Sequence, residues 1–430
     1  MPLKKRNKRD YDIVIVGSGP AGLSAAVELS KHKGIKSLLI EKNDFLDVST
    51  RSWSTFKSVL KKYNLLDAAC YQLNHVRFRS LGGNGYTVHT GKDYLYVVNE
   101  RKFKELLLKR VKINKMDKVE VKSFEHSHNR VLLNTTKGKI ITKILIDASG
   151  NYGLCRKKFR IPVDTKVYFK CRLLEGCHFE GDTAPWGIIL TKKKREEAFI
   201  AAWAEPYSNS KVLIATESYA HKKIPSGLHT QVLNKFVKDP EFRPIFKDSK
   251  IVREWNTEVP VTPLERVAYD NIIMVGDASC QTRPLMMEGL RPGMHEGEVA
   301  AKIVAKAIKQ KNYSYKILKS YEDKIIHDLK FHENQELAKI FQLLFIYYNS
   351  KEFERFFSEV NKLDSKVLLD VLRAEVKFSD LPQIYQMIHR IVPVSELVLN
   401  LSKKDRHVFV QRLELYLEDE FKELINKVLF

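Results

Sequence analysis

Three glycines near the N-terminus, Gly17, Gly19 and Gly22, have the G-x-G-x-x-G spacing that brings bare backbone against phosphate groups. Gly17 permits a tight turn, Gly19 leaves room for a pyrophosphate, and Gly22 lets a helix pack closely on a strand. The helix that follows would direct its unpaired N–H groups and the positive end of its dipole at the phosphates. Glu41 stands 24 residues after Gly17, where a carboxylate would accept ribose hydroxyls. This spacing predicts a dinucleotide site.

The residues around the glycines supply the elements that such a site needs. The apolar run YDIVIV (11–16) predicts a strand, residues 17–34 predict a turn and an amphipathic helix, and IKSLLIE (35–41) predicts a second strand. A glycine motif alone is weak, because structural turns also contain it. The complete strand-helix-strand context and the terminal Glu41 favour dinucleotide binding over a structural turn.

Two later segments resemble further strands of the same sheet. Residues 143–159 begin as an apolar strand and reach Asp147-Ala148-Ser149-Gly150, and residues 271–279 reach Gly276-Asp277. Ligands of open α/β sheets bind outside the carboxyl ends of the strands, so both loops should lie near the Gly17 loop.

In this order, the motifs resemble those of the FAD proteins of the geranylgeranyl reductase and p-hydroxybenzoate hydroxylase superfamily. The D-A-S-G at 147–150 is most similar to the geranylgeranyl reductases. The resemblance implies FAD as cofactor, with Glu41 on the adenosine ribose, Asp277 on the ribityl chain and Arg101 beside the cofactor. The cofactor contacts that it implies come from Gly17, Gly19, Pro20, Ala21, Gly22, Glu41, Lys42, Arg101, Ala148, Gly150, Gly276, Asp277, Pro284, Gly289 and Leu290.

The resemblance implies an α/β fold with a Rossmann-like, three-layer ββα FAD-binding domain, an antiparallel-sheet substrate domain and a C-terminal helical region. Strand-like runs between 166 and 217 are typical of such a substrate sheet, although each could also be plain core. The expected FAD-binding domain joins 10–74, 97–160 and 265–310; the substrate domain joins 75–96 and 161–264; the helical region covers 311–430.

The loop after Asp277 departs from the family pattern, because Met286, Met287, Glu288 and Arg291 stand among the expected Pro and Gly residues. Its helix N-terminus would place positive potential near a flavin ring. Arg291 either adds charge at that edge or pairs with Glu288 or Glu296.

Candidates for acid–base chemistry are few. His295 would suit proton donation near neutral pH, although a histidine one turn into a helix is more often structural. Glu288 and Arg291 are the other candidates, and no catalytic residue is assigned. Arg51, Ser52 and Trp53 are possible cofactor or substrate contacts. No metal-ligand spacing occurs, and five cysteines without a CxxC pair favour reduced thiols.

The chain is strongly basic, with 74 Lys+Arg against 52 Asp+Glu and a net charge of +22. Such a charge attracts nucleic acid, an anionic membrane surface or a phosphorylated substrate, or it reflects lysine spread over the whole surface. No nucleic-acid-binding signature accompanies it. Without an apolar signal region or a long apolar stretch, we expect a cytoplasmic protein. The apolar segment 336–348 is expected to be buried or to lie on a membrane surface.

The resemblance implies an enzyme that saturates C=C bonds of an isoprenoid lipid or diphosphate by hydride transfer from reduced FAD. NADPH or ferredoxin would be the external electron donor, and the basic surface would serve an anionic head group or membrane. A flavin monooxygenase and a lycopene-cyclase-like flavoprotein are the alternatives. A further alternative, from a different class of protein, is a basic flavoprotein that catalyses no reaction.

Overall fold

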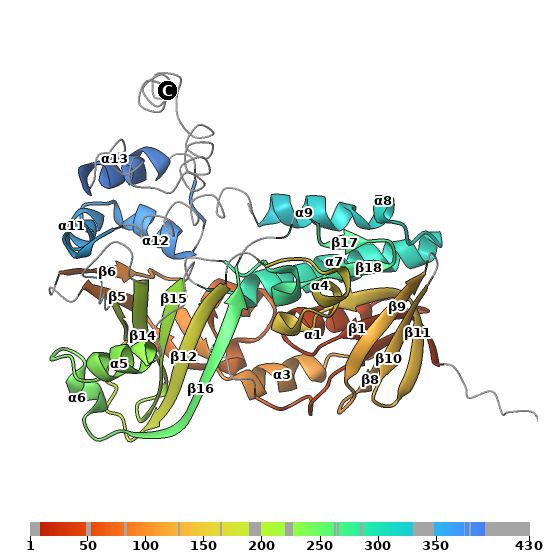
Figure 1. The fold of residues 1–430 in the computed structure, drawn as a ribbon, viewed down its shortest axis with the longest axis horizontal. Helices are drawn as coiled ribbons and strands as arrows, with labels where there is room; N and C mark the ends of the chain where they lie inside the picture. The colour runs from red at the N-terminus through yellow and green to blue at the C-terminus, as the bar shows by residue number, and fades with distance from the viewer. Residues whose placement is uncertain are drawn as a thin grey trace, which may run out of the picture.

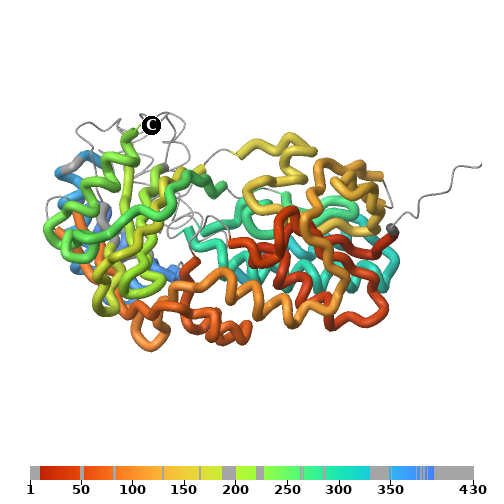
Figure 2. The backbone as a smooth tube through the Cα atoms, turned by 90° about the horizontal axis from the view of Figure 1, so that it is seen from below, coloured from red at the N-terminus to blue at the C-terminus, as the bar shows by residue number. Residues whose placement is uncertain are grey.

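The computed structural model describes residues 9–48, 53–80, 84–127, 130–163, 166–188, 199–219, 227–261, 264, 266–283, 287–329, 348–373, 375–377 and 380–391. The molecule is elongated. Figures 1 and 2 show the N-terminal strands packed with residues of the 270–310 region in one half, and the strands between 166 and 260 in the other.

An eight-stranded sheet forms the first half, with the central order β17-β18-β11-β1-β2-β8. β1 pairs in parallel with β11 and β2, and β11 pairs in parallel with β18, so the ends of these strands at Val16, Ile40, Asp147 and Met274 lie in register. Residues Ile13, Val14 and Ile15 in the central strand are fully buried, as expected for a strand covered on both faces. The strands are β1 (Arg9–Val16), β2 (Ser37–Ile40), β8 (Asn114–Met116), β9 (Val121–Ser127), β10 (Arg130–Thr135), β11 (Gly138–Asp147), β17 (Ala268–Tyr269) and β18 (Ile272–Met274).

A seven-stranded sheet, in the order β16-β12-β15-β14-β13-β5-β6, forms the second half. Its pairs are antiparallel except β13 with β5. In addition to the strand-like runs between 166 and 217, β16 forms at 250–260 by pairing with β12. The strands are β5 (His75–Ser80), β6 (Gly85–His89), β12 (Lys166–Glu175), β13 (Thr183–Ile188), β14 (Phe199–Ser208), β15 (Lys211–Tyr219) and β16 (Lys250–Pro260).

A small sheet of β3 (Ser54–Phe56), β7 (Leu95–Val98) and β4 (Ala69–Leu73) adjoins it, and helices cover the sheets. The C-terminal helices α11 and α12 contact β6. The helices are α1 (Pro20–Leu29), α2 (Lys57–Lys62), α3 (Glu100–Leu108), α4 (Leu154–Phe159), α5 (Leu228–Phe236), α6 (Arg243–Phe246), α7 (Leu290–Gln310), α8 (Tyr315–Leu318), α9 (Ser320–Asp328), α11 (Ser350–Val360), α12 (Ser365–Arg373) and α13 (Leu381–Ile391).

The expected α/β architecture with a second, antiparallel sheet and C-terminal helices is confirmed. The exact domain boundaries stay a prediction. Among the described helices, none combines the length and apolar character that crossing a membrane requires. The segments at 336–347 and 392–430 lie outside the described residues.

Helices α1 and α7 approach each other closely through a glycine. A Cβ built on Gly297 of α7 would lie 2.1 Å from the carbonyl oxygen of Ala21 and 3.0 Å from the amide nitrogen of Ala25 in α1. The hydroxyl of Ser24 donates a 2.6 Å hydrogen bond to the Met294 carbonyl across the same contact. Two chain segments some 270 residues apart are thereby joined.

We expect Gly297→Ala to lower the free energy of unfolding by about 1 to 3 kcal/mol, because the added methyl group must push the two helices apart. Chemical denaturation of the cofactor-free protein measures this. Gly19→Ala is the matched control, since Gly19 has φ −70° and no atom within 4 Å of an added Cβ. Equal stability of the two variants would contradict the packing argument.

Candidate functional site

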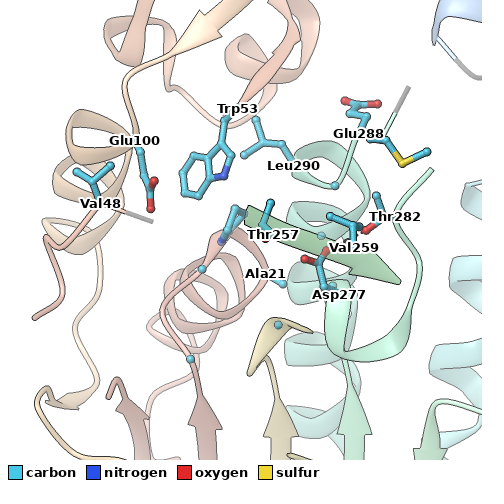
Figure 3. A pocket seen from close by; sticks show the side chains of 18 of the residues that line it. Ala21, Val48, Trp53, Glu100, Thr257, Val259, Asp277, Thr282, Glu288 and Leu290 are labelled. Atoms are coloured by element: carbon cyan, nitrogen blue, oxygen red, sulfur yellow. Dashed lines mark hydrogen bonds between the residues drawn. The ribbon is translucent and has the colours of Figure 1, made fainter. Parts of the chain in front are cut away.

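A cavity of about 430 Å³ runs from the carboxyl ends of the parallel strands to one face of the seven-stranded sheet (Figure 3). Most of the predicted cofactor residues meet at its first end. Those that line it are Gly17, Gly19, Pro20, Ala21, Glu41, Lys42, Ala148, Gly150, Gly276, Asp277, Gly289 and Leu290.

The glycine loop has the geometry that its spacing predicts. Gly17 has φ +106°, and a Cβ there would lie 2.2 Å from the Ala148 carbonyl oxygen. A Cβ on Gly22 would lie 1.9 Å from the Gly17 carbonyl oxygen, so Gly22 packs under the loop and does not line the cavity. Gly19 faces open space, and α1 begins there without a side-chain cap. The first turn of α1 therefore has free N–H groups for an anion.

The carboxylate of Glu41 is fixed beside this loop. Its Oε2 accepts hydrogen bonds of 2.8 Å from both the amide and the hydroxyl of Ser18, and its Oε1 accepts one of 3.1 Å from the Asn43 amide. A carboxylate has about four acceptor positions, so capacity remains for a ribose hydroxyl. This arrangement fits the predicted role of Glu41.

The two predicted aspartates have different surroundings. Asp147 is fully buried and accepts hydrogen bonds from the amides of Ser149 and Cys155, so it holds its own loop together. Asp277 lines the cavity, and its Oδ1 accepts a 2.9 Å hydrogen bond from the Thr282 hydroxyl. Asp277 therefore fits a ligand contact, whereas Asp147 shapes the turn.

Glu296 positions the Asp277 loop from beneath. Its Oε2 accepts hydrogen bonds from the Gly276 amide (2.6 Å) and the Ser279 hydroxyl (3.1 Å), and the residue is fully buried. Burial raises the pKa of Glu296 to about 8, an effect that these hydrogen bonds partly offset. Glu296 therefore stabilises the site without lining it.

The structure does not bring Arg101 or His295 to the cavity. The Arg101 side chain is 62% exposed and pairs with Glu105, because α3 turns Glu100 and Lys104 toward the cavity instead. His295 bonds Asp328 at 3.0 Å, and burial lowers its pKa. Neither side chain lines the cavity, since Arg101 pairs within α3 and His295 pairs with Asp328 of α9, and the roles predicted for them stay predictions.

Ion pairs hold the loop after Asp277, which differs from the family pattern. Arg291 pairs with Glu288 at 2.9 Å and with Glu375 at 2.5 Å, which agrees with the pairing alternative for Arg291. Glu288 lines the cavity and also accepts a 3.1 Å hydrogen bond from the Thr55 hydroxyl. Trp53 lines the cavity (Figure 3), while Arg51, Ser52, Pro284 and Met286 lie outside the described residues.

The second end of the cavity is apolar. The sequence predicts a substrate sheet here, but not which of its residues line the cavity. Its carbon-rich lining comes from the two antiparallel sheets and from α12. The lining includes Phe56, Leu73, Val76, Leu95, Phe169, Ala184, Trp203, Val259 and Leu372.

Two carboxyl groups, Glu205 and Glu217, stand in this apolar lining, and neither is among the predicted site residues. Burial raises the pKa of Glu217 to about 8, partly offset by a hydrogen bond from Trp203. Burial likewise raises the pKa of Glu205 to about 7, partly offset by a hydrogen bond from Ser54. The available signal was a Glu at the end of each of two largely apolar strand segments, 198–205 and 211–217.

Together, the fold and a cavity that joins a dinucleotide cradle to an apolar chamber define a flavin-dependent oxidoreductase. The chain belongs to the lycopene cyclase protein family, whose model matches residues 12–397.

Curated relatives and solved structures agree with this class. A digeranylgeranylglycerophospholipid reductase of Methanococcus vannielii is 27% identical over 358 residues, which cover 75% of this chain and 86% of the relative. The protein of the same name from Methanocaldococcus jannaschii is 26% identical over 339 residues, which cover 73% of this chain and 81% of the relative.

Among solved structures, a geranylgeranyl bacteriochlorophyll reductase-like protein from Thermoplasma acidophilum superimposes with a TM-score of 0.76 at 16% identity, covering 91% of this chain and 99% of that one. The flavin-dependent brominase Bmp2 gives a TM-score of 0.67 at 18% identity, covering 85% and 94%. The resemblance to the geranylgeranyl reductase superfamily is thus confirmed, and the structural likenesses show the shared fold.

We expect Gly19→Ala to weaken dinucleotide binding at least about tenfold, a loss of about 1.4 kcal/mol, because its methyl group occupies space that a pyrophosphate needs. Equilibrium dialysis with FAD as the probe measures the affinity. Denaturation of the cofactor-free variant supplies the control, since its stability should match the wild type. Unchanged FAD affinity would contradict the assigned cradle.

Glu296→Gln should flatten the dependence of stability on pH. The pKa of Glu296 is raised from 4.5 to about 8 on folding, so its contribution is fully present below pH 4.5 and is lost as the pH rises toward 8. The wild type should therefore lose up to about 1.4 kcal/mol of unfolding free energy per pH unit relative to the variant. Urea denaturation at pH 5, 6.5 and 8 measures the difference, and parallel curves would contradict it.

Proposed function

We propose that the protein is an FAD-dependent reductase that saturates C=C bonds of an isoprenoid carried on a lipid or a diphosphate. The observation that carries this proposal is the continuity of the cavity. A cradle for a dinucleotide at the strand ends opens directly into a chamber lined by aliphatic and aromatic side chains. The curated relatives named as digeranylgeranylglycerophospholipid reductases support the same substrate class.

FAD fits the residues at the first end. The glycine loop and the start of α1 would hold the pyrophosphate, Glu41 the adenosine ribose, and Asp277 the ribityl chain. When bound and reduced, FAD supplies the hydride. The chain's own residues orient the alkene in the apolar chamber and exclude water from it.

We also propose an external electron donor and an anionic lipid or membrane as partners. A nicotinamide or a ferredoxin would re-reduce the cofactor. The net charge of +22 would attract the anionic head group of a lipid or the surface of an anionic membrane, where we place the protein as a peripheral cytoplasmic enzyme.

A second candidate is a cyclase-type reaction, in which an isoprenoid is rearranged without net oxidation or reduction. The lycopene cyclase family model favours it, because the match spans residues 12–397. Both candidates require an isoprenoid in the same chamber, and they differ in whether the flavin is oxidised in each turnover.

Anaerobic reduction of the FAD-loaded protein with dithionite, followed by addition of a digeranylgeranylglyceryl phospholipid, separates these functions. A reductase should recover the absorbance of oxidised flavin only after the isoprenoid is added, and each saturated bond should gain two hydrogen atoms by mass spectrometry. An isomeric product without flavin oxidation would support the cyclase. Oxidation that requires oxygen and yields a hydroxylated product would overturn both in favour of a monooxygenase.

A further inference from the structure

Glu217 occupies a distinctive place in the apolar half of the cavity. Through the registers of β15, it lies opposite Phe169 of β12 and Ala201 of β14, so its side chain projects from the same sheet face as theirs. The residue is 4% exposed and lines the cavity. Among the described residues, no lysine or arginine forms an ion pair with it. A carboxyl group in such surroundings is favoured in its neutral, protonated form.

The neighbours of Glu217 suit a substrate that becomes electron-poor. Trp203 and Phe169 line the cavity beside it, and an indole or phenyl face stabilises positive charge. Trp203 also donates a hydrogen bond to the Glu217 carboxyl. An isolated isoprenoid C=C bond has no carbonyl to accept the electrons of a hydride, so its reduction depends on a proton delivered to the second carbon.

We propose, on the basis of the proposed function, that Glu217 is the proton donor to the isoprenoid alkene. The O–H bond of its carboxyl group breaks and a C–H bond forms at one alkene carbon. A bound, reduced flavin would supply the hydride that the other carbon needs, so that the π bond would be lost, the alkene reduced and the flavin oxidised. The Glu217 carboxylate then regains a proton from solvent.

The location of Glu217 agrees with this role. Thr257 of β16 lies opposite Phe169, and Thr257 lines the same cavity as Asp277 and Ala21 of the cofactor end (Figure 3). Thr257, Phe169 and Glu217 lie opposite one another on the adjacent strands β16, β12 and β15. The backbones of Thr257 and Glu217 are therefore two strand spacings apart, or roughly 10 Å. An alkene between them could meet the cofactor on one side and the carboxyl group on the other.

The other acids of the cavity fit the role less well. Glu205 lies opposite Leu213, four residues farther along β15 from Glu217. One of its carboxyl oxygens is inaccessible and has no hydrogen-bond partner, and Ser54 bonds the carboxyl group. Glu288 forms an ion pair with Arg291 and accepts a hydrogen bond from the Thr55 hydroxyl. Glu205 therefore supplies a matched control, because it is a second carboxyl group in the same chamber with a raised pKa.

The test compares the full-length, FAD-loaded wild type with Glu217→Gln, Glu217→Asp and Glu205→Gln. Each protein is reduced without oxygen and mixed with the digeranylgeranylglyceryl phospholipid, and flavin oxidation is followed in a single turnover from pH 6 to 9. Glu217→Gln should slow this step at least about 100-fold while leaving FAD binding and its reduction by dithionite unchanged. Glu205→Gln also changes the lining of the chamber, so its diagnostic readout is the pH profile: it should keep the loss of rate above about pH 8 that Glu217 produces.

The pH profile adds a readout that a structural role would not produce. The wild-type rate should fall as the pH rises through about 8, because the neutral acid is then lost. Glu217→Asp should oxidise the flavin more slowly, but its rate should still fall at high pH (the alkaline limb of the profile). If Glu217→Gln does not fold, Glu217→Asp is the variant that tests the proposal. In the flavin-free protein, tryptophan fluorescence should titrate over the same range through the bond between Trp203 and Glu217, and this titration should vanish in Glu217→Gln.

Wild-type rates in Glu217→Gln, or disappearance of the loss of rate above about pH 8 in Glu205→Gln, would overturn the assignment of Glu217. An aspartate variant without an alkaline limb would do the same. If no isoprenoid oxidises the reduced wild type, the proposed function fails and the proton-donor role falls with it. The fluorescence titration distinguishes this result, because it reports the protonation of Glu217 without any substrate.

Discussion

The close contact between α1 and α7 is the constraint on which the site depends. Gly297 lets α7 approach the Ala21 carbonyl oxygen, and Ser24 bonds the Met294 carbonyl across the same contact. This contact holds the glycine loop beside the loop of Asp277, although the two are far apart in the chain. A larger side chain at position 297 would separate the two walls that a dinucleotide must touch together.

The parts of the site that follow from local sequence were predictable. The spacing of Gly17, Gly19 and Gly22 fixes a turn, and the strand ends before Glu41 and Asp277 place both carboxylates at one edge of a parallel sheet. The direction of side chains on helices was harder to predict. Arg101 lies one residue beyond the face of α3 that meets the cavity, and this face is set by how α3 packs, which its own sequence does not reveal.

The substrate half was predictable as a sheet but not as a chemical surface. Several of its strands are apolar on both faces, so alternation does not show which residues point into the cavity. Glu205 and Glu217 share a face only through the pairing of β14 with β15, and Phe169 joins them through β12. Register between strands brings the acids and aromatic rings together, and no short motif in the chain encodes it.

A neutral acid in an apolar chamber limits the chemistry that can take place there. Burial of Glu217 costs stability once it is ionised, so the folded chain holds its proton across the neutral range. Alkene reduction and isoprenoid cyclisation both begin from an electron-rich C=C bond, and both need a proton placed beside it away from water. In the reduction that we propose, Glu217, with Trp203 and Phe169 around it, would meet that need. Under the proposed function, the acid would serve the alkene, and a flavin bound at the other end of the cavity would supply the hydride.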